Sequence, residues 1–212
     1  LSDKVLFKKN EDKRMSLASL TKLMTALVIF ENPDRYNLSS FVEISEDAIL
    51  KENGQTKMRS GDVFSVEAIL YLMLLESSNG AAHALSEVVG QEYFVDLMNG
   101  KARNLGLKKT FFTNPTGLDP TIPGENINYS TADDLVKFTD YLLKNHSKIW
   151  EISSLKEYTI YKQNGEAIGL VNTNQLLGEI PGLIGGKTGW TFRARGNLLL
   201  VLHNPSRTGY LI

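Results

Sequence analysis

The hydrophobic residues of this chain include two nearly continuous apolar runs, Leu20–Phe30 and Val66–Leu75. A helix that is apolar on every side belongs in the interior of a protein, so both runs predict central helices. Ser65 stands directly before the second run, where its hydroxyl can cap the helix. Three further helices are expected in more mixed sequence, at Ala81–Val89, at Tyr93–Leu105, and from the capping pattern Ser130-Thr131-Ala132-Asp133 to about Lys144.

Short apolar segments bounded by turn residues predict strands. Gln163-Asn164-Gly165 separates Glu157–Tyr161 from Ala167–Val171, and this pattern indicates a hairpin. The stretch that ends at Gly61 is polar, and residues 114–124 are rich in Pro and Gly, so both predict irregular structure. The other expected strands are Val5–Phe7, Phe41–Ile44, Gly185–Trp190, Asn197–His203 and Tyr210–Ile212.

Composition limits the possible chemistry and partners. The 212 residues, 42% hydrophobic and 22% charged, are ordinary for a single globular domain, and the net charge of −1 gives no electrostatic reason to expect nucleic acid or an anionic membrane. The absence of cysteine removes disulfides, thiolate catalysis and thiolate-bound zinc. No apolar run reaches the roughly 18 residues of a membrane span, and no signal peptide opens the chain. His83, His146 and His203 lack metal-motif spacing, so a zinc site built from them is not expected.

Ser19-Leu20-Thr21-Lys22 offers a hydroxyl and an amine at helical spacing. Residues three apart lie on one face of a helix, so Ser19 Oγ and Lys22 Nζ can meet. A serine needs a base to become a nucleophile, and a lysine with a usual pKa of about 10.4 must lose solvent or approach another cation to act as one. The alternative is a helix cap followed by a solvated lysine, but the apolar residues around Lys22 favour a buried amine.

Two later strings add the remaining polar groups of such a site. Ser77 and Asn79 interrupt an apolar helix with a hydroxyl and an amide. The alternative is that these residues only end one helix and cap the next. Lys187 and Thr188 lie on a predicted strand and can bind a carboxylate, while Gly189 lets a substrate backbone approach closely. An ordinary strand with an exposed lysine is the alternative there. Because the three strings occur together and in order, they indicate a serine acyl-transferase that uses lysine to move protons.

The chain resembles the low-molecular-mass penicillin-binding proteins, the serine-type D-Ala-D-Ala carboxypeptidases, over nearly its whole length. The resemblance is carried by Ala18–Ala26, Asn114–Leu118, Tyr129–Leu135 and Gly185–Gly189. It implies an α+β fold: an antiparallel sheet of about five strands flanked by helices, an all-helical lobe, and an active site in the cleft between them. It also implies an extracytoplasmic enzyme that removes the terminal D-alanine from peptidoglycan stem peptides and is acylated by β-lactam antibiotics.

The resemblance implies a role for each matched residue. Ser19 would be the acylated nucleophile and Lys22 its base. Ser77 would pass the proton to the leaving D-alanine, and Asn79 would hold the substrate amide. Lys187 and Thr188 would bind the substrate carboxylate. The backbone N–H groups of Ser19 and Trp190 would stabilise the oxyanion.

Two departures from the family pattern stand out. Residues 1–212 are expected to form one catalytic domain that starts within its first strand and stops before the last strand and the C-terminal helix, so that a membrane anchor would lie outside the chain. The string Thr191–Asn197 also replaces a pattern that is small and acidic in the family.

Three other functions remain open at this point. A DD-endopeptidase that cuts peptide cross-links would use the same motifs. A class A-type β-lactamase would need an E-x-x-L-N string between Ser77 and Lys187, and Glu125 is followed by Asn126-Ile127-Asn128-Tyr129 instead. A non-catalytic binder of cell-wall peptides would not need a nucleophile and a base.

Overall fold

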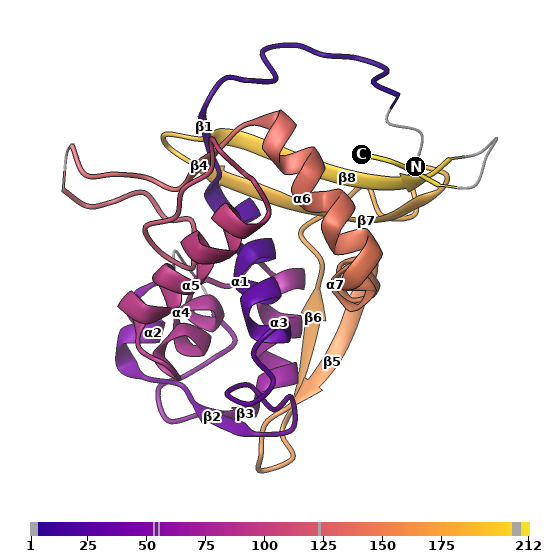
Figure 1. Cartoon of the computed structure of the whole chain (residues 1–212). Coiled ribbons are helices and arrows are strands. Elements are labelled where there is room, and N and C mark those ends of the chain that lie inside the picture. The colour runs from indigo at the N-terminus through magenta and orange to yellow at the C-terminus, as the bar shows by residue number, and fades with distance from the viewer. Residues whose placement is uncertain (1–3, 53, 55, 123, 205–208) are drawn as a thin grey trace.

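The computed structural model describes residues 4–52, 54, 56–122, 124–204 and 209–212. Two helices, α1 (Thr21–Phe30) and α3 (Val66–Leu75), lie at the centre of the molecule (Figure 1). Nearly every side chain of both helices is buried, as their apolar sequences predict. The Ser65 hydroxyl accepts a hydrogen bond from Ala68 N and caps α3, which confirms the expected start of that helix.

The first part of the chain surrounds these two helices with further helices. α4 (Asn79–Glu87) packs against α3, α2 (Glu46–Leu50) and α5 (Gln91–Asn104), and α5 also contacts α1. Below them in Figure 1, β2 (Phe41–Glu43) and β3 (Val63–Ser65) form a two-stranded ladder. This part corresponds to the expected helical lobe.

The last part of the chain builds an antiparallel sheet in the order β7-β8-β9, at the top of Figure 1. The long strands β7 (Leu183–Thr191) and β8 (Arg195–His203) pair so that Gly189 faces Asn197. Helix α7 (Ser147–Ser153) packs on β7, and a single residue separates it from α6 (Ala132–Asn145). The smaller strands are β1 (Met15–Ser16) with β4 (Tyr129–Ser130), the hairpin β5 (Glu157–Tyr161) with β6 (Ala167–Val171), and β9 (Tyr210–Leu211).

The structure confirms the α+β class and most expected elements. The hairpin strands β5 and β6 have the predicted bounds. The three last strands are present with shifted ends, and the described residues contribute three strands to the main sheet, where the resemblance implies about five in the complete fold.

Some expectations from the sequence are wrong. Val5–Phe7 is not a strand: no described residue pairs with it, and its side chains are 57–81% exposed. The segment expected to be irregular contains α2, a five-residue helix capped by Ser45 in which only Ala48 is fully buried, so its apolar pattern is weak. Helix α6 is capped by Thr131, whose hydroxyl accepts from Asp134 N, rather than by Ser130.

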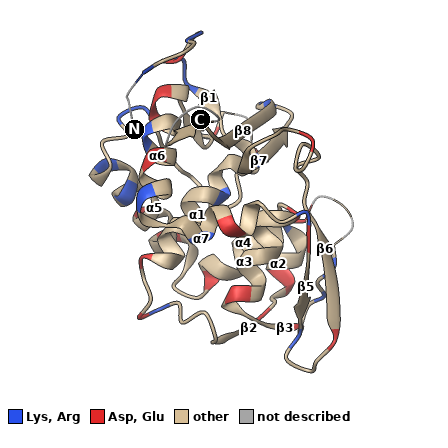
Figure 2. Cartoon of the chain, turned by 90° about the vertical axis from the view of Figure 1, so that its right-hand side faces the viewer, with Lys and Arg blue, Asp and Glu red and all other residues tan. Residues whose placement is uncertain are grey.

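Charged residues of both signs occur on most of the helices and on the hairpin, as Figure 2 shows. In the part of the chain that the structure describes, no helix has both the length and the apolar character needed to cross a bilayer.

Candidate active site

Ser19 lies in a tight turn where the backbone is forced into an uncommon conformation. The turn, η1 (Ala18–Leu20), leads directly into α1, and Ala18 has a positive φ of 45°. Such a φ is unfavourable for a residue with a Cβ and is maintained only where the surroundings fix it. Here Gly117 packs against the turn so closely that a Cβ on Gly117 would lie 1.9 Å from the carbonyl oxygen of Ala18. The loop that contains Gly117 therefore holds the turn of Ser19 in place.

Lys22 is fully buried one helical turn after Ser19. Its Nζ lies 2.9 Å from Ser19 Oγ, and it donates to Asn79 Oδ1 at 2.7 Å and to the backbone oxygen of Thr116 at 2.7 Å. A neutral amine has two N–H donors and one lone pair. The amide and the carbonyl oxygen can only accept, so they take both N–H groups, and the lone pair is left for Ser19, the one partner that has a proton to give.

The second turn, between α3 and α4, places Ser77 opposite a second buried lysine. Ser77 has a positive φ of 60°, and its Oγ accepts a hydrogen bond of 2.8 Å from Lys187 Nζ. Glu52, just beyond α2, fixes this turn because its carboxylate accepts from the Ser78 hydroxyl, from Asn79 N at 3.2 Å and from Gly80 N at 3.0 Å. A carboxylate at the first backbone N–H groups of a helix is a stabilising arrangement.

Strand β7 closes the other side of the site. Lys187 is almost completely buried, and its Nζ also donates to the backbone oxygen of Thr188 at 2.9 Å. The Thr188 hydroxyl is exposed and lies 2.7 Å from Thr173 Oγ1. Gly189 runs so close to the nucleophile turn that a Cβ there would lie 2.9 Å from Ser19 N.

Asn197 on β8 connects the sheet to the backbone just before the turn of Ser19. Its Nδ2 donates to the backbone oxygens of Ser16 at 2.8 Å and Leu17 at 3.0 Å. Because Asn197 faces Gly189 across the β7–β8 ladder, one pair of residues sets the position of Ser19 relative to the sheet.

The two buried lysines influence each other's charge. Burial lowers the pKa of Lys22 well below its ordinary value, and the nearby charge of Lys187 lowers it further, whereas Glu52 acts in the opposite direction. Burial lowers the pKa of Lys187 to about 7. Both effects disfavour the protonated amines, so the neutral form of Lys22 is more accessible than that of a solvated lysine.

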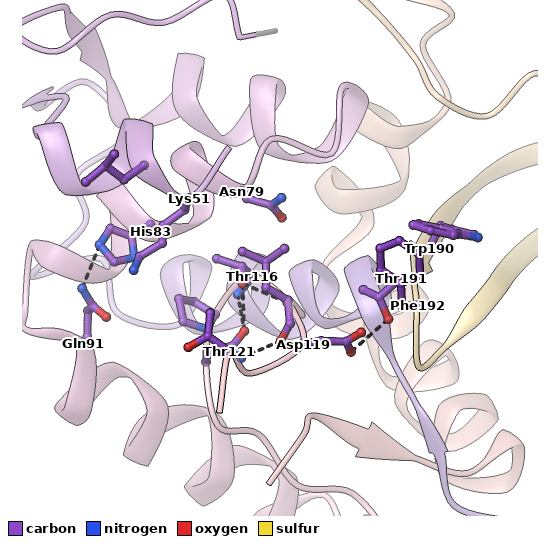
Figure 3. Close-up of a pocket in the computed structure, with 14 residues that line it drawn as sticks. Lys51, Asn79, His83, Gln91, Thr116, Asp119, Thr121, Trp190, Thr191 and Phe192 are labelled. Carbon is purple, nitrogen blue, oxygen red and sulfur yellow. Dashed lines mark hydrogen bonds between the residues drawn. The ribbon is translucent and has the colours of Figure 1, made fainter. Parts of the chain in front are cut away.

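A pocket of about 780 Å³ opens beside these groups (Figure 3). Asn79 and Trp190 line it, and so do Thr116, Asp119 and Phe192, to which the sequence analysis assigned no role in the site. In Figure 3, Asp119 lies on the side of Trp190 and Phe192, while Lys51, His83 and Gln91 lie at the other end. Among the described residues, no group of three or more His, Asp or Glu side chains could hold a metal.

The described structure therefore gathers the three sequence strings at one place, with two buried lysines and an adjoining pocket. A family model of D-alanyl-D-alanine carboxypeptidases, peptidase family S11, matches residues 1–204. The chain belongs to this family.

Named relatives in several bacteria resemble this S11 chain. It is 37% identical over 196 residues to D-alanyl-D-alanine carboxypeptidase DacF of Bacillus subtilis (strain 168), with 91% of this chain and 49% of DacF covered. It is 34% identical over 202 residues to the D-alanyl-D-alanine endopeptidase of Haemophilus influenzae, with 94% and 66% covered. Penicillin-binding protein D2 of Listeria monocytogenes, solved in the ampicillin-bound form, has a TM-score of 0.77 at 30% identity, with 95% and 80% covered. The chain spans about half the length of the first relative.

Sequence reasoning missed several groups of this S11 site. Glu52 lies in a segment expected to be irregular, and nothing in its local sequence indicates a partner 26 residues away. Thr116 contributes through its backbone oxygen, which residue type cannot reveal, although Asn114-Pro115-Thr116-Gly117 was recognised as a family string. Asn197 lies in the string that departs from the family pattern.

Proposed function

We propose that this S11 chain is the catalytic part of a serine DD-peptidase that removes the terminal D-alanine from peptidoglycan stem peptides. The observation that carries the proposal is the contact of 2.9 Å between Nζ of the fully buried Lys22 and Oγ of the half-buried Ser19. Such a pair serves nucleophilic catalysis, because a serine hydroxyl attacks only when a base takes its proton.

In the first step, Ser19 Oγ attacks the carbonyl carbon of the penultimate D-alanine and its proton passes to Lys22 Nζ. The carbonyl oxygen becomes an oxyanion, which the backbone N–H groups of Ser19 and Trp190 would stabilise. The close approach of Gly189 to Ser19 N supports this arrangement, since it brings β7 beside the nucleophile turn. Donors of this kind are typically worth about 10²–10³ in rate.

In the second step, the bond from carbon to nitrogen breaks and the leaving D-alanine nitrogen takes a proton, while the hydroxyl that gives it is reprotonated with the proton that Lys22 had removed from Ser19. Ser77 is suited to deliver the proton to the leaving nitrogen because its hydroxyl contacts Lys187 and lies in the turn that also carries Asn79. Water then attacks the acyl-enzyme and gives a proton to the neutral Lys22, which returns it to Ser19 Oγ as the bond from carbon to Ser19 Oγ breaks and the shortened peptide leaves.

The substrate carboxylate would bind at Lys187 and Thr188. As an ammonium, Lys187 has three N–H groups, of which Ser77 Oγ and Thr188 O accept two. The third N–H and the exposed Thr188 hydroxyl can then bind the carboxylate. Neither a metal nor another cofactor enters this reaction.

We also propose that β-lactam antibiotics acylate Ser19. We further propose that the protein acts outside the cytoplasm, where peptidoglycan lies, and that any attachment to the membrane is made through an anchor outside this chain. The ampicillin-bound relative supports the first point. Incubation with a penicillin and measurement of the intact mass should show one added drug mass in the wild type and none in Ser19→Ala. Lys22→Arg should also fail to react, because a guanidinium does not lose its proton near neutral pH. An unmodified wild type would refute the proposal, and an adduct that disappears within seconds would favour a β-lactamase.

A DD-endopeptidase is the second candidate, favoured by the H. influenzae relative of that name. D-Alanine release from a peptide with a free C-terminal carboxylate is compared with cleavage of the corresponding C-terminal amide. A carboxypeptidase should lose about 1.5–3 kcal/mol of transition-state stabilisation with the amide, the usual worth of a charge-assisted hydrogen bond. Equal turnover of the two peptides would favour the endopeptidase.

A further inference from the structure

Helix α1 directs two buried polar side chains at one loop, residues 113–117. Lys22 and Thr25 are both fully buried, and residues three apart share one face of a helix. Lys22 Nζ donates to the backbone oxygen of Thr116, and Thr25 Oγ1 donates to that of Pro115, each at 2.7 Å. Two successive carbonyl oxygens of the loop are therefore bound to the helix that carries the proposed base.

Asn128, which is only 2% exposed, fastens the same loop through every polar atom of its side chain. Its Oδ1 accepts from Thr113 N at 2.7 Å and from Asn114 N at 3.2 Å, and its Nδ2 donates to Asn114 O at 2.8 Å. The second N–H of Nδ2 reaches Thr21 Oγ1 on α1 at 3.0 Å. A flipped amide would not satisfy these partners, because backbone N–H groups only donate and a carbonyl oxygen only accepts. One side chain thus ties the loop to the helix of Lys22.

Inside the loop, Asn114 sets the direction of the carbonyl group that Lys22 uses. Its Oδ1 accepts from Thr116 N at 3.1 Å and from Gly117 N at 2.7 Å. The Thr116 carbonyl and the Gly117 N–H belong to one planar trans peptide group, in which they point in opposite directions. Because Asn114 holds the N–H, the oxygen of this group is presented on the other side, where Lys22 Nζ lies.

We propose that Asn128 and Thr25 are positioning residues of the reaction, because both clamp this loop to α1. The clamp keeps the Thr116 oxygen on one N–H of Lys22, so the lone pair of the amine stays directed at Ser19. An amine free to rotate would spend part of its time with an N–H toward the serine, where it cannot accept a proton. The inference rests on the proposed function and deepens it by naming what orients the base. Both residues act through the loop and take no proton themselves.

Two substitutions at Thr25 separate its hydrogen bond from its packing. Thr25→Val keeps the shape and loses the hydroxyl, whereas Thr25→Ser keeps the hydroxyl and loses a methyl group. The measured quantity is the first-order rate constant of acylation by a labelled penicillin at saturating concentration. We expect Thr25→Val to lower it by about 10- to 100-fold and Thr25→Ser to stay within about threefold of the wild type, since a misplacement of about 1 Å can cost about 10²-fold.

Thr139→Val on α6 is the matched control for loss of a buried threonine hydroxyl. Thr139 is as buried as Thr25, but its hydroxyl meets no hydrogen-bond partner in any segment that the structure describes. This variant should acylate at the wild-type rate.

Asn128→Ala removes the clamp at its other end and should slow the same step. Combined with Thr25→Val, it should slow acylation by less than the product of the two single effects, because both residues act through one loop. Effects that multiply in full would overturn the shared clamp. Asn128→Ala decides alone if circular dichroism shows that Thr25→Val does not fold.

The outcomes separate this inference from the proposed function. A wild type that forms no penicillin adduct refutes the proposed function. A wild type that forms the adduct, with Thr25→Val equally fast, overturns only the present inference, and so does a Thr25→Ser variant slower than Thr25→Val, because packing would then explain the contact. A change confined to the binding constant of penicillin would also overturn it, because the loop would then only shape the pocket that Asn114 and Thr116 help to line.

Discussion

Lys22 and Lys187 make opposite demands on pH, although they lie in one site. In the proposed mechanism Lys22 must be neutral to accept the Ser19 proton, so activity should fall when pH drops through its lowered pKa. Lys187 must be charged to bind a carboxylate, and burial places its pKa at about 7, so binding weakens as pH rises above that value. For a free-acid peptide, we therefore expect kcat/KM to have both an acidic and an alkaline limb.

The peptide amide isolates the second effect. It has no carboxylate for Lys187 to bind, so its alkaline limb should be much weaker while its acidic limb remains. Steady-state rates for the acid and the amide across the pH range measure both limbs. Alkaline limbs of equal size would show that the charge of Lys187 does not act on the substrate carboxylate.

At this scale the sequence predicts the side chains and misses the groups that orient them. Ser19, Lys22, Ser77 and Lys187 could be found because hydroxyl and amine chemistry is visible in residue type and spacing. Glu52 and the Thr116 oxygen could not, because their importance comes from where the backbone brings them. The catalytic roles of the predicted residues themselves stay predictions.

At the scale of elements, the approach of β7 to the nucleophile turn leaves no room for a methyl group. Gly189→Ala would place a Cβ 2.9 Å from Ser19 N, so the strand or the turn must move and the oxyanion donors separate. We expect penicillin acylation to slow by about 10²-fold, in line with loss of one such donor. Gly196→Ala is the matched control on the neighbouring strand, because a Cβ there meets nothing within 4 Å. Equal acylation rates in the two variants would contradict this reading of the contact.

Glu52 caps the start of helix α4 and raises the pKa of Lys22, so its replacement should change both the rate and the pH dependence of catalysis. Glu52→Gln removes a charge that raises the pKa of Lys22, so that pKa should fall and the acidic limb of activity should move to lower pH. The plateau rate should also drop, by about tenfold, because the turn that carries Ser77 and Asn79 loses its charged cap. Glu92→Gln on the exposed start of α5 controls for loss of a negative charge. A lower plateau with an unmoved acidic limb would leave Glu52 a purely structural role.

Elements with strong local signals were predicted best. The hairpin β5–β6 has a turn sequence that fixes its register, and α1 and α3 have apolar residues on all sides. Val5–Phe7 fails for the opposite reason: apolar content makes a strand possible, but a strand exists only where another backbone pairs with it. Helix α2 buries a single residue completely, too little to give a periodic pattern.

At the scale of the whole molecule, the α+β class was predicted from the family resemblance, and the residues that line the pocket were not predicted. The pocket is lined by residues from 50 to 192, which meet only when the helical part and the sheet are packed together. Sequence reasoning expected a cleft there from the family resemblance, but neither Asp119 nor Phe192 has any local feature that would assign it to the cleft.

The three partners of Lys22 Nζ lie 3, 57 and 94 positions away in the chain. Contacts between distant residues form late in folding, because the intervening chain must first lose its freedom. A partly folded protein can contain α1, and with it Ser19 and Lys22 at the correct spacing, yet Lys22 would remain solvated and protonated. Reactivity of Ser19 is thus a property of the finished fold, and a labelled penicillin should count native molecules. In urea, the labelled fraction and the circular dichroism signal should share one midpoint, whereas labelling that persists beyond the loss of that signal would mean that α1 alone can activate its serine.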